Sequence, residues 1–192
     1  MKFIPPIIDS KSPGEKWLME TFQELENNKV ADWVILHSLD IREHIAQKKG
    51  EADFVLIIPK KGILIIEVKA VKSVKYEKGM WTLGQNEPES RGPFKQASDN
   101  CESFERKLKK EFPVLKDILM WHVVIFTEIE FDIRSPTEWE DWEFIDRPEL
   151  NEAIAQKSFF KLFEKILEKA KTKFPKNKYI KNAPDNNQYD VL

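Results

Sequence analysis

Three charged residues stand at the ends of two apolar segments in the middle of the chain. Asp53 opens the segment 53–59, and Glu67 and Lys69 close the segment 62–69; both segments are rich in Val, Ile and Leu. Such segments are typical of buried β-strands, where a charged side chain is costly unless it has a partner. Two carboxylates beside an ammonium suit a divalent cation such as Mg²⁺ and a phosphate, because hard cations take oxygen ligands and leave coordination positions open.

Each of these residues has a role in such a site. Asp53 and Glu67 would be metal ligands, together with the carbonyl of Val68. Lys69 would hold the attacking water and stabilise the charge that develops on phosphorus. The alternative needs no ligand, because Lys69 could simply neutralise both carboxylates in a salt bridge at the end of a sheet. The loose spacing of these residues is compatible with both interpretations.

The two segments predict a β-hairpin whose register decides whether the charged residues meet. We expect a three-residue loop, 60–62, with Gly62 in the left-handed conformation. That loop predicts the following cross-strand pairs: Pro59 with Ile63, Val55 with Glu67, and Asp53 with Lys69. Cross-strand partners share a face, so the charged side chains would converge, whereas a loop of two or four residues would turn Asp53 to the opposite face.

A helix is predicted from Ser12 to about Asn27. Ser12 is suited to the N-cap, Pro13 to the first helical position and Glu15 to the third, which is a capping-box arrangement. Glu15 could fold back onto the Ser12 amide, or it could point towards the Asp53 and Glu67 end as an acid that supports the metal site; the two are not exclusive. The expected core face of this helix consists of Leu18, Met19, Phe22 and Leu25.

A second helix is predicted from Pro93 to about Glu111, ended by Pro113. Its apolar residues recur every three or four positions, and Cys101 belongs to that stripe. We therefore expect Cys101 to be a core residue and not a nucleophile. Gln96 lies off the stripe, with Asn100 one turn later.

The remaining pattern predicts strands at 32–39, 81–83 and 121–126 and a long helix from Pro148 to about Lys171. Strands next to crossover helices indicate mixed α/β layering. His37 and His44 lack zinc-ligand spacing, so we interpret them as surface or hydrogen-bonded structural residues. The acidic, aromatic segment 138–143 is expected either to pack its tryptophans onto the domain or to dock a partner.

Composition limits the class of protein. The chain has 192 residues with 41% hydrophobic content, which is long enough for one substantial core. Its 31 basic and 33 acidic residues leave a formal charge of −2, so any contact with nucleic acid must come from local patches. A single cysteine excludes an internal disulfide, and no signal peptide or membrane span is apparent. These features predict a cytoplasmic protein.

Two groups of lysines are local candidates for contact with a phosphate backbone. The first follows the hairpin, and the second lies in a basic tail, 171–192, which has no acidic residue among its first lysines. Either group could instead be a solvated edge or tail. The candidates are Lys72, Lys75, Lys78, Lys173, Lys176 and Lys178.

Taken together, these motifs resemble the nuclease-related domain, or NERD, family of the PD-(D/E)XK nuclease superfamily. The resemblance rests on Gly14-Glu15, Glu51-Ala52-Asp53, Glu67-Val68-Lys69 and Gln96, and it covers roughly residues 12–128. Ala52 stands where the superfamily name has Pro, a position that is loosely kept. The resemblance implies a restriction-endonuclease-like core, a mixed central β-sheet flanked by helices, Mg²⁺- or Mn²⁺-dependent phosphodiester cleavage, and a Gln96 that faces the active site.

The sequence therefore predicts a single nuclease-related domain that hydrolyses DNA. Its core would span about 12–128, a helical extension about 148–172, and the basic tail 171–192 would lead to a further domain. Because NERD-like domains are often joined to helicase modules, a helicase module or partner is expected outside these residues. The alternative is a catalytically silent module of the same fold that binds nucleic acid or protein.

Overall fold

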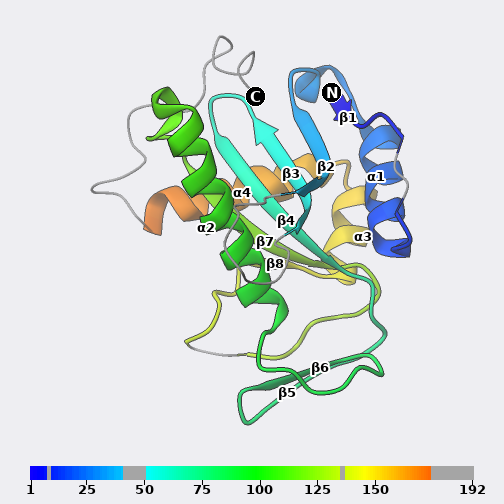
Figure 1. Ribbon diagram of the computed structural model, residues 1–192. Helices are drawn as coiled ribbons and strands as arrows, with labels where there is room; N and C mark the ends of the chain where they lie inside the picture. The colour runs from blue at the N-terminus through cyan, green and yellow to red at the C-terminus, as the bar shows by residue number, and fades with distance from the viewer. Residues whose placement is uncertain (8–9, 41–50, 135–136, 174–192) are drawn as a thin grey trace.

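The centre of the molecule is a six-stranded mixed β-sheet in the order β1-β2-β3-β4-β7-β8 (Figure 1). The computed structural model describes residues 1–7, 10–40, 51–134 and 137–173. The six strands are β1 (Lys2–Ile4), β2 (Val34–Asp40), β3 (Glu51–Ile58), β4 (Gly62–Lys69), β7 (Met120–Phe126) and β8 (Phe144–Ile145). The predicted class, a mixed α/β fold with helices on the sheet, is confirmed, and the strands predicted at 32–39 and 121–126 correspond to β2 and β7.

Strand direction determines which residues meet at one edge of this sheet. β2, β3 and β4 are antiparallel neighbours, whereas β4, β7 and β8 run parallel to one another. The start of β3 and the ends of β4 and β7 therefore lie at the same edge. Asp53 near the start of β3 and Lys69 at the end of β4 are brought to that edge by topology alone.

Helices cover both faces of the sheet (Figure 1). One face packs against α1 (Pro13–Leu25), α3 (Arg147–Ala155) and α4 (Phe159–Lys173), and the other against α2 (Pro93–Glu111). Two short 3-10 helices, η1 (Asn28–Val30) and η2 (Pro113–Leu115), complete the described helical segments. No helix in the described part of the chain is both long and apolar enough to cross a bilayer.

Helix α1 begins where it was predicted to begin. The hydroxyl of Ser12 accepts a hydrogen bond from the Glu15 amide at 3.3 Å. Leu18, Met19 and Phe22 are buried in the core. In a capping box the Glu15 side chain would accept a hydrogen bond from the Ser12 amide. Here the Ser12 amide donates to Ser10 Oγ instead, at 3.0 Å. The Glu15 carboxylate is thereby left to face another partner.

The β3–β4 hairpin has a three-residue loop, but the loop is 59–61 and not 60–62. The observed ladder runs from Ile58 opposite Gly62 to Phe54 opposite Ile66, so the predicted pairs are wrong by two residues. Pro59 has no N–H to donate to a ladder and lies in the turn instead. Lys60, with φ 63°, takes the left-handed conformation predicted for Gly62. A displacement of two residues keeps every side chain on its expected face.

The predicted C-terminal helix is two helices, α3 and α4. Lys157 has φ 54°, and its amide donates to Ile154 O at 3.0 Å, while the Ser158 amide donates to Ala153 O at 2.8 Å. These bonds end α3 in the manner of a helix C-cap, and α4 starts at Phe159. The apolar pattern continued across the break, which is why periodicity alone predicted one helix.

A separate two-stranded hairpin, β5 (Val74–Glu77) and β6 (Met80–Leu83), projects from the sheet edge (Figure 1). The predicted strand 81–83 belongs to β6. Trp81 is buried in an aromatic cluster with Phe94, Phe131 and Trp139. The burial of Trp139 shows that the acidic, aromatic segment 138–143 packs this tryptophan onto the domain.

Helix α2 places Cys101 in the core, as predicted. The side chain is buried among residues of α2 and the sheet, and burial raises the pKa of its thiol well above the usual range. A neutral, inaccessible thiol does not act as a nucleophile.

Candidate active site

The structure brings Asp53, Glu67 and Lys69 together on the α2 side of the sheet edge. Continuing the β3–β4 register by one residue sets Asp53 opposite Glu67. Asp53 Oδ2 accepts a hydrogen bond from the Val68 amide at 2.7 Å, and Lys69 Nζ lies 2.7 Å from Glu67 Oε1. The sequence prediction that these side chains converge is thus confirmed, although the pairing that achieves it differs.

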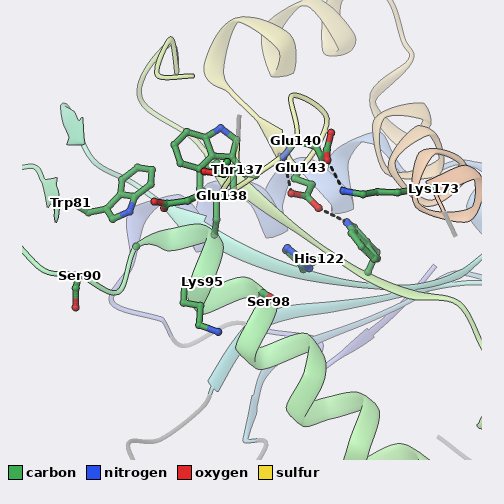
Figure 2. A pocket seen from close by; sticks show the side chains of 14 residues that line it. Trp81, Ser90, Lys95, Ser98, His122, Thr137, Glu138, Glu140, Glu143 and Lys173 are labelled. Atoms are coloured by element: carbon green, nitrogen blue, oxygen red, sulfur yellow. Dashed lines mark hydrogen bonds and ion pairs between the residues drawn. The ribbon is translucent and has the colours of Figure 1, made fainter. Parts of the chain in front are cut away.

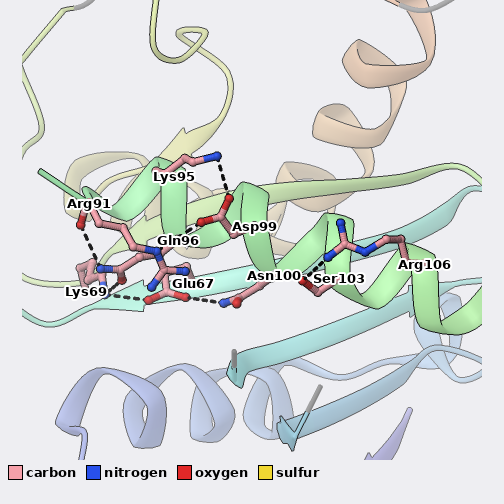
Figure 3. A network of polar contacts seen from close by, with 9 residues as sticks. All are labelled: Glu67, Lys69, Arg91, Lys95, Gln96, Asp99, Asn100, Ser103 and Arg106. Atoms are coloured by element: carbon pink, nitrogen blue, oxygen red, sulfur yellow. Dashed lines mark hydrogen bonds and ion pairs between the residues drawn. The ribbon is translucent and has the colours of Figure 1, made fainter. Parts of the chain in front are cut away.

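Helix α2 adds two amide side chains to this cluster (Figure 3). Lys69 Nζ donates to Gln96 Oε1 at 2.8 Å, and Gln96 Nε2 in turn donates to Arg91 O at 3.2 Å. One turn later, Asn100 Nδ2 donates to Glu67 Oε2 at 3.3 Å. Both oxygens of Glu67 are therefore oriented, one by Lys69 and one by Asn100.

Helix α1 and strand β2 supply a second pair at the same edge. His37 Nε2 and Glu15 Oε2 are 2.8 Å apart, and both side chains are mostly buried. Burial by itself would raise the pKa of Glu15, but hydrogen bonds from His37, Ser10 and Ser12 outweigh it and lower the pKa below its usual value. Glu15 is therefore held as a carboxylate near Asp53.

Asp53 has the largest pKa shift among the acids of the cluster. Burial, the charge of Glu67 and the more distant charge of Glu15 raise its pKa to about 8, against the opposing effects of the Val68 amide and Lys69. The charged form of Asp53 is therefore disfavoured unless a cation is bound nearby. Carboxyl groups with a raised pKa are common at functional sites, where a bound cation can compensate the closely spaced negative charges.

The donor set fits a divalent cation that keeps most of its coordination positions for water and substrate. Across the residues that the structure describes, no three His, Cys, Asp or Glu side chains converge tightly enough to hold a metal by themselves. Two carboxylates are available at Asp53 and Glu67. The N–H and C=O of one strand residue point to the same edge, and the Val68 N–H points at Asp53, so its carbonyl faces that side too. Mg²⁺ is commonly bound by one or two carboxylates plus phosphate.

Sequence reasoning missed two of the residues that complete the site. The sequence predicts His37 to be a surface residue or a hydrogen-bonded structural residue, and its contact with Glu15 spans 22 positions of the chain. Asn100 was noted only as lying one turn after Gln96, which was the one available signal, and its contact with Glu67 spans 33 positions. Pairing of β2 with β3 and packing of α2 on β4 create these contacts.

A cavity lies elsewhere, against the N-terminal half of α2 (Figure 2). It has a volume of about 580 Å³ and is lined by residues of α2, β7 and the segment 137–143, and by Lys173 at the end of α4. The ammonium of Lys173 pairs with Glu140. Burial, followed by the charge of Lys173, lowers the pKa of His122 to about 4. We locate the chemistry at the carboxylate cluster and not in this cavity, because Asp53, Glu67 and Lys69 do not line it.

The lysines predicted to contact nucleic acid fall into three places. Lys72, Lys75 and Lys78 are exposed on or beside the β5–β6 hairpin. Lys173 lies at the cavity. Lys176, Lys178 and His44 lie outside the described residues.

The family model of the nuclease-related domain matches residues 10–127, which is more than half of the chain. The chain therefore belongs to the NERD family, as its motifs predicted. Searches among curated proteins and solved structures gave no match. The matched region contains Glu15, Asp53, Glu67, Lys69 and Gln96, and so it spans the whole carboxylate cluster.

Proposed function

We propose that the chain is a metal-dependent nuclease that hydrolyses phosphodiester bonds of DNA. The observation that carries the proposal is the convergence of Asp53, Glu67 and Lys69 at one sheet edge in a member of a nuclease-related family. A salt bridge alone accounts for Lys69 and Glu67, but it leaves Asp53 with a pKa of about 8 beside two further carboxylates. That arrangement is costly unless a cation binds there.

In this proposal Asp53 and Glu67 bind Mg²⁺ or Mn²⁺, with the Val68 carbonyl as a third ligand. When bound, the cation would lower the pKa of a water molecule and neutralise negative charge on the phosphate. Asn100 and Lys69 fix the two oxygens of Glu67, so that this ligand is held in place before the cation binds.

Lys69 is proposed to orient the attacking water and to stabilise the negative charge on the phosphoryl oxygens. Its ammonium has three donors, of which Glu67 and Gln96 take two at 2.7 and 2.8 Å. Among the described residues the ammonium has no third acceptor, so its remaining N–H is available to water or phosphate. Gln96 acts by holding the ammonium in this orientation, and Arg91 O holds Gln96.

Glu15 is proposed to support the site from α1. His37 fixes its Oε2, and the resulting carboxylate adds negative charge beside Asp53. That charge strengthens attraction for a cation in the site.

Cleavage of DNA by the purified chain in Mg²⁺ or Mn²⁺ tests the proposal. We expect Asp53→Asn and Lys69→Gln to fold normally and to lose cleavage by about a hundredfold or more, since each removes a group that acts on the reacting phosphate. Asp32→Asn and Lys29→Gln change the same residue types at exposed positions and should cleave like the parent. If both site variants kept full Mg²⁺-dependent activity, the proposal would be wrong.

The alternative is a silent binding module, which the ion pair of Lys69 with Glu67 favours, because that pair neutralises one carboxylate without a cation. Calorimetric titration with Mn²⁺ separates the two functions. A catalytic site binds Mn²⁺ in the parent and not in Asp53→Asn, whereas a silent module binds DNA equally well in chelator and takes up no Mn²⁺ at Asp53. DNA as the nucleic acid, a cytoplasmic location and a helicase module as partner are further parts of the proposal that rest on the family resemblance and composition.

A further inference from the structure

The β5–β6 hairpin is inserted between β4 and α2, two of the elements that build the carboxylate cluster. β4 ends at Lys69, the chain then forms the hairpin, and it returns to begin α2 at Pro93, three residues before Gln96. A segment in this position follows one element of the site, β4, and precedes another, α2. The hairpin is thus connected at both ends to elements that carry Glu67, Lys69 and Gln96.

The hairpin is fixed firmly at its base. Trp81 exchanges backbone hydrogen bonds with Glu89 at 2.7 and 2.8 Å, and the Gly84 amide donates to Ser73 O at 2.8 Å. The Trp81 indole packs against Gly92, where an added Cβ would lie 2.2 Å from Nε1. Only glycine permits that approach, so the anchoring ring sits directly on the first turn of α2.

Residues 70–84, which include the hairpin, contain three lysines and one acidic residue, Glu77, in a chain whose formal charge is −2. Lys72, Lys75 and Lys78 are exposed, whereas Val74 and Tyr76 turn inward in the alternation of β5. Among the described residues, none of the three lysines belongs to an ion pair, in contrast to Lys69, Lys95 and Lys109. Unpaired, solvated ammonium groups are what a phosphate backbone attracts, because their contact releases condensed counterions.

From these observations we infer that the hairpin is the arm that holds the phosphate backbone of nucleic acid beside the carboxylate cluster, without reading its sequence. The inference rests on the proposed nuclease function and adds to it the surface that holds the substrate and the manner of binding. Lysine presents a compact point charge and not the bidentate fork that reads base edges, so contacts of this kind set position and carry no sequence information. Because Trp81 packs on Gly92, the hairpin also contacts the start of α2, close to Gln96.

The test is binding of a short fluorescent DNA duplex, measured by anisotropy in chelator so that cleavage cannot interfere. The triple variant Lys72→Gln, Lys75→Gln, Lys78→Gln is expected to bind about tenfold more weakly at low salt. The slope of log affinity against log salt should become shallower by about two to three, because each lost phosphate contact removes about 0.9. Two duplexes of unrelated sequence should bind alike.

The matched control removes three exposed lysines elsewhere, by Lys29→Gln, Lys60→Gln and Lys116→Gln. It should keep the parental affinity and salt slope. Equal loss in the control, unchanged binding by the hairpin variant, no duplex binding by the parent, or a strong preference for one sequence would each overturn the inference. Far-ultraviolet circular dichroism confirms that both triple variants are folded.

The two proposals can fail separately. A parent that cleaves DNA while the hairpin variant binds normally would contradict the hairpin inference alone. A parent that binds DNA through the hairpin but cleaves nothing in Mg²⁺ or Mn²⁺ would contradict the nuclease and leave the arm in place.

Discussion

Asp53 shows how far the surroundings of one residue can alter its chemistry. It lies near the start of β3, where its carboxylate accepts a hydrogen bond from the Val68 amide and where Glu67 and Glu15 act on its pKa. Its pKa of about 8 means that the metal-free site holds a proton where the proposed function needs a cation. Binding of a divalent cation at this position must therefore release a proton at neutral pH, and affinity for the cation should rise with pH up to about 8.

The same pKa predicts how stability depends on pH in the metal-free protein. The pKa of Asp53 is about 8 in the folded protein and 3.8 is its ordinary value, so between these pH values the folded state binds more protons than the unfolded state. Stability therefore falls as pH rises through this window. Asp53→Asn removes that penalty, and we expect it to be more stable than the parent at pH 8 by about 1–3 kcal/mol, and to differ less at pH 5.

Urea unfolding at the two pH values measures this effect. Asp32→Asn, at an exposed position, should show no such gain. A parent whose stability rises between pH 5 and pH 8 relative to Asp53→Asn would show that Asp53 is already ionised in the folded state.

At the scale of elements, the start of α1 depends on close contact with the sheet edge. A Cβ on Gly14 would lie 2.8 Å from both Ala70 Cβ and Thr127 Oγ1. These atoms belong to the segments that follow β4 and β7, so the contact fixes where Glu15 stands relative to Asp53. Gly14 is needed for the close approach, and Glu15 depends on Gly14 for its position.

Gly14→Ala should therefore disturb both the fold and the site. Alanine in a helix gains about 0.4–1 kcal/mol from a less flexible unfolded chain, but the steric overlap costs about 1–3 kcal/mol, so we expect net destabilisation. Displacement of Glu15 should also weaken Mn²⁺ binding, measured by calorimetry. Lys16→Ala, at an exposed position of the same helix, is the control and should be neutral or slightly stabilising. Unchanged stability and Mn²⁺ binding in Gly14→Ala would mean that α1 can shift without affecting the site.

At the scale of the whole molecule, the carboxylate cluster brings together side chains from elements on both faces of the sheet. β3, β4, α1 and α2 all contribute side chains to it, and these elements belong to both faces of the sheet. A cation bound there would hold both layers to one edge of the sheet. Because it binds the folded state and not the unfolded one, it should stabilise the entire fold.

We expect Mn²⁺ at about a hundred times its dissociation constant to add about 2.7 kcal/mol, which corresponds to a rise in Tm of several degrees for a domain of this size. Thermal unfolding followed by circular dichroism, with and without chelator, measures the shift. Asp53→Asn should lose most of it. A shift of equal size in this variant would locate the cation elsewhere.

Much of this architecture was readable from local pattern. The helix from Pro13 and the helix from Pro93 were predicted from their caps and apolar stripes, and β4 and β7 from their continuous apolar runs. The exact pairs of the β3–β4 hairpin were wrong, because a proline at the turn moved the loop by one residue. The predicted C-terminal helix is also interrupted at Lys157, and the apolar pattern, which continues from α3 into α4, did not predict the interruption.

By itself, the sequence determined which face of its own strand or helix each residue occupies. That was sufficient to bring Asp53, Glu67 and Lys69 to one side, because a register error of two residues does not change a face. The tertiary structure alone decided which elements face one another. The pairing of His37 with Glu15 and of Asn100 with Glu67 joins residues 22 and 33 positions apart, and periodicity within one element carries no information about the partner packed against it.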